Sequence, residues 1–250
     1  IYYPLSTLML AGIRDFLIIV KSCDLNSFRK LLGDGYNLGI RISYQIQDYP
    51  GGIAQAFLLG EEFISESSVV LILGDNLYYG SQLINYFRDI NDEDKGATIF
   101  AYPVKNPNIY GVPEFNSEGK VLSIEEKPIN PKSNYAITGI YFFDNKVIEL
   151  AKKLTPSERG ELEITDLNNF YLEEEKLSVK LLSRGIAWFD TGNFESLHDA
   201  SSYVKTIQER QGLMIGSPEE IAWRNGWINN FDLEKLANTF DNNIYGTYLL

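Results

Sequence analysis

The sequence predicts an α/β fold with a doubly wound sheet, an inserted antiparallel layer and a C-terminal helical appendage. Three observations support this prediction. In the first hundred residues, apolar segments of strand length alternate with segments that carry apolar residues at helical spacing. Hairpin-like segments follow, and the last quarter of the chain is mostly helical in pattern. Such alternation of strands and helices is typical of parallel βαβ units.

The first part of the chain contains the alternating elements. We expect strands over residues 16–20, 40–47, 69–73 and 98–102. Between them, the spacing of apolar residues predicts helices over residues 25–32, 53–63 and 82–90. These elements would form the doubly wound sheet.

After residue 104 the pattern changes. We expect antiparallel segments at residues 111–115, 121–126 and 134–143, with a turn at 116–119. Helical periodicity returns at 146–154 and 164–174, and a further strand is expected at 178–182. From residue 194 the pattern is helical, with breaks at 212–218 and 226–230. We therefore expect an α/β domain over residues 1–193 and a helical extension over residues 194–250.

Composition excludes several classes of protein. The 250 residues carry a formal net charge of −12, which argues against nucleic-acid binding because phosphates require clustered Lys and Arg. Cys23 is the only cysteine, so an intramolecular disulfide is excluded and a reducing cytoplasm is favoured. No apolar run approaches the roughly 20 residues of a membrane span. We expect a cytoplasmic protein that contacts no membrane.

Two aspartates are the strongest candidates for chemistry. Asp75 follows the apolar run 69–73, and Asp190 ends the run 187–189; both precede small or turn-forming residues. Buried strands of open α/β sheets deliver ligand-binding groups at the rim of the sheet. Two carboxylates there would suit one Mg²⁺, whose shell substrate phosphates complete. The alternative is that both are ordinary strand-end turn residues.

The remaining residue inventory favours phosphoryl or nucleotidyl transfer. The spacing of Gly33, Gly35 and Gly39 does not match a dinucleotide-binding loop, and no P-loop string is present. His198 is the only histidine and falls within a predicted helix, so we expect a structural role for it. Lys127 directly follows the apolar strand 121–126 and precedes a proline, where it could neutralise a phosphate. A solvated Glu-Glu-Lys turn is the alternative.

Glycines mark two further places where a ligand could approach the backbone. Gly51 and Gly52 join a strand to a helix within residues 45–56, where glycine leaves backbone N–H groups accessible to an anion or a base edge. An ordinary Pro-Gly turn would explain them equally well. Gly139 follows Thr138 in mid-strand, and a glycine weakens a strand unless something packs closely on it. The acidic residues of segment 159–166 could simply complement a helix dipole.

Taken together, these strings resemble the sugar-1-phosphate nucleotidylyltransferases, within them the thymidine-nucleotide type that supplies dTDP-rhamnose synthesis. The resemblance covers essentially the whole chain and rests on strings that occur in the family's order. They are Tyr-Pro-Leu-Ser-Thr-Leu-Met-Leu-Ala-Gly-Ile at residues 3–13, Gly-Gly-Ile-Ala-Gln-Ala at 51–56, Leu-Gly-Asp-Asn at 73–76, Tyr-Gly-Val at 110–112, Glu-Glu-Lys-Pro at 125–128, Arg-Gly-Glu-Leu-Glu-Ile-Thr-Asp at 159–166 and Trp-Phe-Asp-Thr-Gly at 188–192. The fold implied is a Rossmann-like doubly wound mixed sheet whose antiparallel layer binds the sugar.

The resemblance also implies an activity. The reaction would be Mg²⁺-assisted, in-line attack of glucose 1-phosphate on dTTP, giving dTDP-glucose and diphosphate. The implied protein is a homo-oligomer, a tetramer in the family, with a regulatory nucleotide-sugar site near subunit contacts. The resemblance implies that Asp75 and Asp190 bind the metal and that Asp75 also contacts the nucleotide. It implies that Gln47 and Gly52 contact the thymine and that Lys127 contacts the sugar phosphate. The residues implied for the hexose are Gly111, Glu126, Lys127, Thr138 and Tyr141, and those implied for the regulatory site are Tyr79, Gly80 and Arg184.

The sequence departs from the family in one respect. The Gly-rich Leu-Ala-Gly-Gly-x-Gly-Thr-Arg-Leu loop and the Lys-Gln-Leu-Leu-Pro string that follows it do not occur in these 250 residues. We therefore expect these residues alone to have impaired activity. A non-catalytic nucleotide-sugar-binding or regulatory subunit is one alternative. A glycosyltransferase is another. Residues Asp92-Glu93-Asp94 match the Asp-x-Asp motif typical of that class, but they lie in a polar connection.

Overall fold

The computed structural model describes residues 1–88, 90, 96–240 and 243–250. The chain forms two compact units. Unit 1 comprises residues 1–44, 73–87 and 186–250, and unit 2 comprises residues 45–72 and 88–185. Each unit is assembled from separate stretches of the chain, so residues far apart in sequence become neighbours within it.

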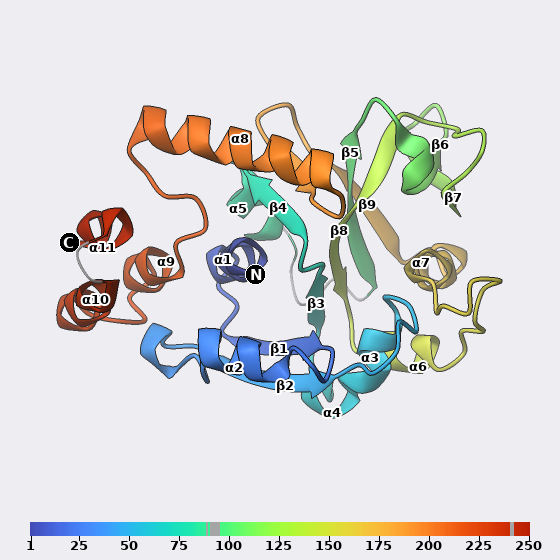
Figure 1. Cartoon of the computed structure of the whole chain (residues 1–250). Helices are drawn as coiled ribbons and strands as arrows, with labels where there is room; N and C mark the ends of the chain where they lie inside the picture. Colours follow the sequence, from blue (N-terminus) through green and yellow to red (C-terminus); the bar gives the residue numbers. More distant parts are fainter. Residues whose placement is uncertain (89, 91–95, 241–242) are drawn as a thin grey trace. The chain divides into compact units, whose positions relative to one another are not determined.

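Unit 1 contains two small sheets and most of the helices (Figure 1). Its elements are α1 (Tyr2–Leu10), β1 (Asp15–Val20), α2 (Leu25–Leu32), η1 (Tyr36–Leu38), β4 (Asn76–Tyr79), β10 (Ala187–Asp190), α8 (Phe194–Gln211), α9 (Pro218–Arg224), α10 (Asn230–Ala237), η3 (Asn238–Phe240) and α11 (Ile244–Leu249). Strand β2 (Arg41–Ile46) begins in unit 1 and ends in unit 2, as does helix α5 (Leu83–Arg88). Strand β1 pairs with β2, and β10 pairs with β4. Helix α1 packs against β4 and α9.

Unit 2 is built on a four-stranded mixed sheet in the order β3-β8-β5-β9. Its elements are α3 (Gln55–Leu59), α4 (Glu61–Ile64), β3 (Val69–Ile72), β5 (Ala97–Pro103), η2 (Pro107–Ile109), β6 (Gly111–Phe115), β7 (Val121–Glu126), β8 (Tyr135–Phe143), α6 (Val147–Ala151), α7 (Ile164–Glu173) and β9 (Leu177–Leu181). Strand β8 is antiparallel to both β3 and β5, and β9 is parallel to β5. Strands β6 and β7 form a separate antiparallel hairpin.

The mixed α/β fold confirms the predicted fold class, with two corrections. The strands expected at 16–20 and 40–47 are β1 and β2, which pair with each other in a separate two-stranded sheet instead of joining the four-stranded one. The segment 134–143, assigned to the inserted layer, lies in the four-stranded sheet as β8, and the hairpin of β6 and β7 forms a sheet of its own. The reason is burial: seven of the nine residues of β8 are buried, on both faces of the strand. A hairpin strand with one face in solvent would show alternating burial, whereas a strand of a sheet covered on both faces is buried along its length.

Local signals explain several element boundaries. Helix α8 begins at Asn193, whose side chain accepts a hydrogen bond from the backbone N–H of Ser196, and ends at Gly212 in the left-handed conformation. The predicted helix over residues 53–63 is instead two helices, α3 and α4, which meet at Gly60. Asn116 closes the predicted turn between β6 and β7, because its Oδ1 accepts from two backbone N–H groups of the turn.

The core of unit 2 lies between the sheet and helices α3, α6 and α7. Phe143 of β8 meets Phe57 of α3 edge-on, with ring centroids 5.2 Å apart. The same ring packs against Tyr171 of α7 at 5.3 Å. These three residues are almost completely buried. Aromatic contacts of this kind add to the stabilisation from burial, so they fix both helices on one face of the sheet.

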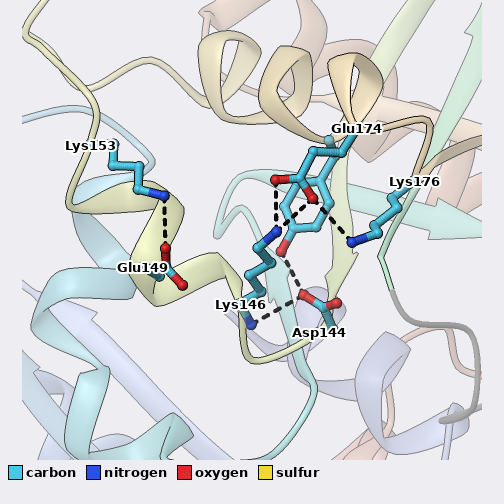
Figure 2. A network of polar contacts seen from close by, with 7 residues as sticks. Asp144, Lys146, Glu149, Lys153, Glu174 and Lys176 are labelled. Carbon is cyan, nitrogen blue, oxygen red and sulfur yellow. Dashed lines mark hydrogen bonds and ion pairs between the residues drawn. The ribbon is translucent and has the colours of Figure 1, made fainter.

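Polar contacts connect the same elements at the surface (Figure 2). Lys146, just before α6, donates to both carboxylate oxygens of Glu174 at 2.7 and 2.6 Å, and Lys176 donates to Glu174 at 3.1 Å. The phenol of Tyr171 donates to Asp144 at 2.7 Å, and burial together with this carboxylate raises the pKa of Tyr171 far above its ordinary value. The beginning of α6, the end of α7 and the start of β9 are therefore held together.

Candidate active site

Strand pairing brings the two predicted aspartates of unit 1 together. Asp75 immediately precedes β4 and Asp190 ends β10, and the antiparallel register of these strands places Asp190 opposite Asn76. Thr191 strengthens the junction, since its backbone N–H and its Oγ1 both donate to the carbonyl oxygen of Asp75, at 2.9 and 2.7 Å. The two carboxylate-bearing turns are thereby fixed to each other.

Gly192 leaves a small space beside both carboxylates. A Cβ atom built on Gly192 would lie 3.1 Å from Oδ1 of Asp190 and 3.5 Å from Oδ2 of Asp75. The backbone N–H of Gly192 also donates to Oδ1 of Asp190 at 3.1 Å. Asp75 is exposed and Asp190 is partly exposed. Two carboxylates therefore flank one solvent-accessible position that any larger residue at 192 would fill.

The donor set fits a hard divalent cation with few protein ligands. Among the described residues there is no cluster of three or more His, Cys, Asp or Glu side chains that could hold a metal ion. A pair of carboxylates is nevertheless sufficient for Mg²⁺, which keeps waters and substrate phosphates in its shell. The arrangement offers two carboxylates to such an ion and leaves the rest of its shell to waters and phosphates.

A second group of predicted residues lies together in unit 2, at the end of the β6–β7 hairpin. Gly111 faces Glu126 in the strand register. Oε2 of Glu126 accepts a hydrogen bond from Oγ1 of Thr165 at 2.6 Å. A Cβ at Gly111 would lie 3.3 Å from that Oγ1 and 3.4 Å from Oε2 of Glu126. The absence of a side chain at Gly111 therefore keeps the surroundings of this hydrogen bond open.

Two cations flank the other oxygen of Glu126. Nζ of Lys127 lies 3.9 Å and Nη2 of Arg159 lies 3.8 Å from Oε1 of Glu126. Arg159 is itself held by both oxygens of Glu163 at 2.9 Å. Lys127 has a φ of +47°, which is uncommon for a residue with a side chain, and its N–H donates to the carbonyl oxygen of Tyr110. The side chain of Lys127 thus lies partly exposed beside Glu126, just after the end of β7.

The predicted base-binding residues also lie in unit 2. Nε2 of Gln47 donates to Oε1 of Gln55 at 2.7 Å and lies 3.5 Å from the carbonyl oxygen of Gly52. Gly52 has a φ of +94°, and a Cβ there would lie 2.3 Å from the carbonyl oxygen of Leu162. The backbone packing against Leu162 by itself explains why glycine is required. A role for Gln47 and Gly52 at the base stays a prediction.

The two residues predicted for the hexose on β8 are buried. Tyr141 is 4% exposed and stacks on Phe143 in the core of unit 2. Thr138 is completely buried, and its Oγ1 has no hydrogen-bond partner. The register between β5 and β8 shifts around Gly139, as a mid-strand glycine indicates. Contact of Thr138 or Tyr141 with a sugar stays a prediction.

The structure places the predicted regulatory residues in both units. Tyr79 ends β4, and its hydroxyl donates to Oε1 of Gln211 at 2.8 Å. Gly80 follows it in unit 1, whereas Arg184 belongs to unit 2 and is exposed. His198 lies exposed on α8. Residues Asp92, Glu93 and Asp94 of the alternative Asp-x-Asp motif lie outside the described residues.

A pocket of about 740 Å³ lies at the opposite end of β8 from Gly111. It is lined by Glu61, Glu66, Ser68, Asp144, Asn145, Lys146, Ile148, Glu149, Lys152 and Lys176. None of the predicted site residues is among them. Its lysines are already paired with carboxylates, Lys152 with Glu61 and the other two with Glu174. Figure 2 shows the ion pairs of Lys146 and Lys176 with Glu174, and we assign no ligand to the pocket.

Sequence reasoning missed four residues that contact the predicted ones. Thr165 and Arg159 lie around Glu126, and Asn76 and Thr191 contact Asp75. All four lie inside the quoted strings, directly beside or near a predicted residue. The signal that could have found them is therefore the string itself, since a polar residue adjacent to a ligand is well placed to orient it.

Comparison with known proteins identifies the family to which this fold belongs. The family model for nucleotidyl transferases matches residues 1–207, and the chain belongs to this family. Among curated relatives, the glucose-1-phosphate thymidylyltransferase of Neisseria meningitidis is 56% identical over all 250 residues and is itself covered to 87%. The enzyme of that name from Mycobacterium tuberculosis strain H37Rv is 52% identical, with all of this chain and 86% of the relative covered.

Solved structures agree with this membership. A Bacillus anthracis protein assigned as a glucose-1-phosphate thymidylyltransferase, in complex with sucrose, is 38% identical with a TM-score of 0.75, over 81% of each chain. A UDP-glucose pyrophosphorylase with UDP-glucose has a TM-score of 0.67 at 19% identity, over 82% of this chain and 86% of its own. The second likeness concerns the fold alone. Among the described residues, no helix combines the length and apolar character needed to span a membrane.

Proposed function

We propose that the chain is a glucose-1-phosphate thymidylyltransferase, which converts dTTP and α-D-glucose 1-phosphate to dTDP-glucose and diphosphate. A phosphate oxygen of the sugar phosphate bonds to the α-phosphorus of dTTP. The bond from that phosphorus to the bridging oxygen of the leaving diphosphate breaks in line. The sugar phosphate is already anionic at pH 7, so the nucleophile needs positioning and charge neutralisation rather than a general base.

The observation that carries this proposal is the identity of 56% over the whole chain to a relative of that name. The convergence of Asp75 and Asp190 beside Gly192 supports it independently, because the reaction requires a divalent cation at the triphosphate. We assign Mg²⁺ to these two carboxylates. When bound there, the ion would offset the negative charge of the phosphates.

The residues of unit 2 supply recognition in this proposal. Gln47 and Gly52 meet the thymine, and Lys127 meets the phosphate of the sugar. The lysine lies 3.9 Å from Glu126, so an arriving phosphate finds it close to the group that we assign to the hexose. Arg159, 3.8 Å from the same carboxylate, is placed to assist. Gly111, Glu126, Thr138 and Tyr141 are the proposed hexose residues.

We further propose that the enzyme is a homo-oligomer, and specifically a tetramer, as the family resemblance implies. Tyr79, Gly80 and Arg184 would belong to a regulatory nucleotide-sugar site near the subunit contacts. A cytoplasmic location follows from the single cysteine alone and stays a prediction.

The test is diphosphate release with a panel of nucleoside triphosphates against glucose 1-phosphate, measured on these residues preceded by the family's Gly-rich segment. We expect dTTP to be the best substrate, with dUTP poorer by about 10-fold or more, because one methyl group in a pocket is worth about 1–3 kcal/mol. Binding of dTDP-glucose without diphosphate release would favour a regulatory subunit. Transfer of glucose from dTDP-glucose to an acceptor would favour a glycosyltransferase. Either result would contradict the proposal.

A further inference from the structure

Asn76 is a buried amide that connects a candidate metal ligand to the interior of unit 1. Only 2% of the residue is exposed. Its Nδ2 donates to Oδ1 of Asp75 at 2.9 Å. Its Oδ1 accepts a hydrogen bond from Nε1 of Trp188 at 2.7 Å. The three side chains therefore form a continuous chain of hydrogen bonds that ends on one of the two carboxylates.

Trp188 decides which way the amide faces. An indole Nε1–H only donates, so the oxygen of Asn76 must face it and the NH₂ group must face Asp75. Turning the amide over would place two donors against each other at the indole and two acceptors against each other at the carboxylate. Trp188 itself is 7% exposed and lies opposite Tyr78 in the β4–β10 register. The strand pair thus fixes the indole, and the indole fixes the amide.

The amide in turn decides which oxygen of Asp75 is available. Oδ1 accepts the hydrogen bond from Asn76. Oδ2 is the oxygen on the side of Gly192, 3.5 Å from the position of a Cβ there. A carboxylate with one oxygen held in this way presents the other in a defined direction. That direction is toward the space it shares with Asp190.

We propose that Asn76 and Trp188 are positioning residues that hold Asp75 so that its Oδ2 is presented to a divalent cation. The inference rests on the metal role proposed above for Asp75 and Asp190, and neither Asn76 nor Trp188 touches the ion. Hydrogen bonds from such neighbours orient metal-binding carboxylates, and their loss typically weakens metal affinity by about 10- to 100-fold. Here the effect originates at an indole in the core, two hydrogen bonds away from the ion.

The experiment measures binding of Mn²⁺ alone to the 250-residue chain by electron paramagnetic resonance, without substrates. Asn76→Leu removes both hydrogen bonds. Trp188→Phe keeps an aromatic ring but removes the indole donor together with part of the ring system, and it provides a second test if Asn76→Leu fails to fold. We expect each variant to bind Mn²⁺ about 10-fold or more weakly than the wild type. Affinities within about twofold of the wild type for both folded variants would overturn the inference.

A matched control separates positioning from general destabilisation. Ser217 is 1% exposed, and its Oγ makes one 2.7 Å hydrogen bond with the hydroxyl of Tyr245 in the same unit. Ser217→Ala removes a buried hydrogen bond that is not connected to Asp75. We expect a similar decrease in Tm with no change in Mn²⁺ affinity. An equal loss of affinity in this control would mean that stability, not orientation, accounts for the effect, and would overturn the inference.

The double variant tests whether the two residues act in series. If Trp188 acts through Asn76, then Trp188→Phe should have no further effect on Mn²⁺ affinity once Asn76 is Leu. Effects that multiply would mean that the residues act independently, and the relay would be wrong.

Asp75→Asn distinguishes this inference from the function on which it rests. If Asp75→Asn leaves Mn²⁺ binding unchanged, the proposed metal role of Asp75 is wrong, and the inference fails with it. If Asp75→Asn abolishes binding while Asn76→Leu and Trp188→Phe do not weaken it, the metal role stands and only the positioning inference fails.

Discussion

At the scale of single residues, the candidate site depends on two aspartates that backbone pairing brings together. Asp75 and Asp190 are at least partly exposed, so their removal should hardly affect the core. Their positions come from the β4–β10 register and from the two hydrogen bonds that Thr191 makes to the carbonyl oxygen of Asp75. Function and stability are therefore separable at these positions.

The first prediction concerns these two aspartates. Asp75→Asn or Asp190→Asn, in a chain that is active, should lower kcat by at least about 100-fold, because each removes an ionic ligand that offsets phosphate charge. The Tm should change little. Steady-state diphosphate release at saturating Mg²⁺ and thermal unfolding are the measurements. Asp199→Asn, an exposed position on α8, is the control and should leave kcat unchanged. If either site variant kept more than about a third of the wild-type kcat, the assignment of that residue would be abandoned.

The second prediction concerns Lys127, whose side chain and backbone can be tested separately. Lys127→Met should raise the KM for glucose 1-phosphate and lower kcat, with the KM for dTTP changing by a few-fold at most. Lys120→Met, exposed on the same hairpin, should change neither. Because φ is +47°, Lys127→Gly should also be more stable to urea than Lys127→Ala, by about 1 kcal/mol. A change confined to the KM for dTTP would mean that Lys127 contacts dTTP and not glucose 1-phosphate.

At the scale of elements, short polar networks hold the ends of helices and strands in unit 2. Glu174 follows α7 and accepts hydrogen bonds from Lys146 before α6 and from Lys176 before β9. These hydrogen bonds, first that from Lys146, lower the pKa of Glu174 below its ordinary value. A group whose pKa is lower in the folded state binds protons more readily when the chain unfolds. Its stabilising contribution is therefore present at neutral pH and is lost on acidification.

The third prediction follows from that pKa. The wild type should be more stable to urea than Glu174→Gln at pH 7. This difference should persist above about pH 4, the ordinary range of a carboxyl group, and should disappear as the pH falls further through the lowered pKa. Urea midpoints at pH 7, 5 and 3 measure it. Glu173→Gln is the matched control, since Glu173 is an exposed neighbour at the end of α7. A difference that is constant with pH would contradict the ion-pair explanation.

At the scale of the whole molecule, the catalytic assignments are divided between the two units. The aspartates proposed for the metal lie in unit 1, and the residues proposed for the base, the hexose and its phosphate lie in unit 2. Neither group contains the Gly-rich loop string that the family resemblance associates with the triphosphate. The triphosphate is thus the part of the substrate for which these 250 residues offer the fewest donors.

The fourth prediction tests this division. The 250 residues alone should bind dTDP-glucose weakly and release diphosphate about 10⁴-fold or more slowly than the same residues preceded by the family's Gly-rich segment. One preorganised hydrogen-bond donor to the charge that develops in the transition state lowers the barrier by about 2.7–4 kcal/mol. A Gly-rich loop with its Arg supplies several such donors. Diphosphate release at equal concentration of the two polypeptides measures it. Rates within about 10-fold of each other would show that such a loop is dispensable.

Much of the local structure could be predicted from the residues in order. The helix expected at 25–32 is α2, and the strands expected at 111–115 and 121–126 are β6 and β7, with the same bounds. Periodicity and turn chemistry depend on residues a few positions apart, so both can be recognised directly in the sequence. The chemically informative strings could be read for the same reason, since Asp75, Asp190 and Lys127 each stand at the end of an apolar run.

Contacts between distant segments were decided only by the tertiary structure. β8 is buried on both faces and lies between β3 and β5. Its almost continuous apolar run is typical of such a strand, but the run does not identify the strands with which it pairs. β4 was not expected, since its four residues gain their strand partner from β10, more than a hundred positions away. The same pairing brings Trp188 to Asn76 and Asn76 to Asp75. The sequence by itself determined which residue types stand at the strand ends; long-range pairing and burial determined which of them meet.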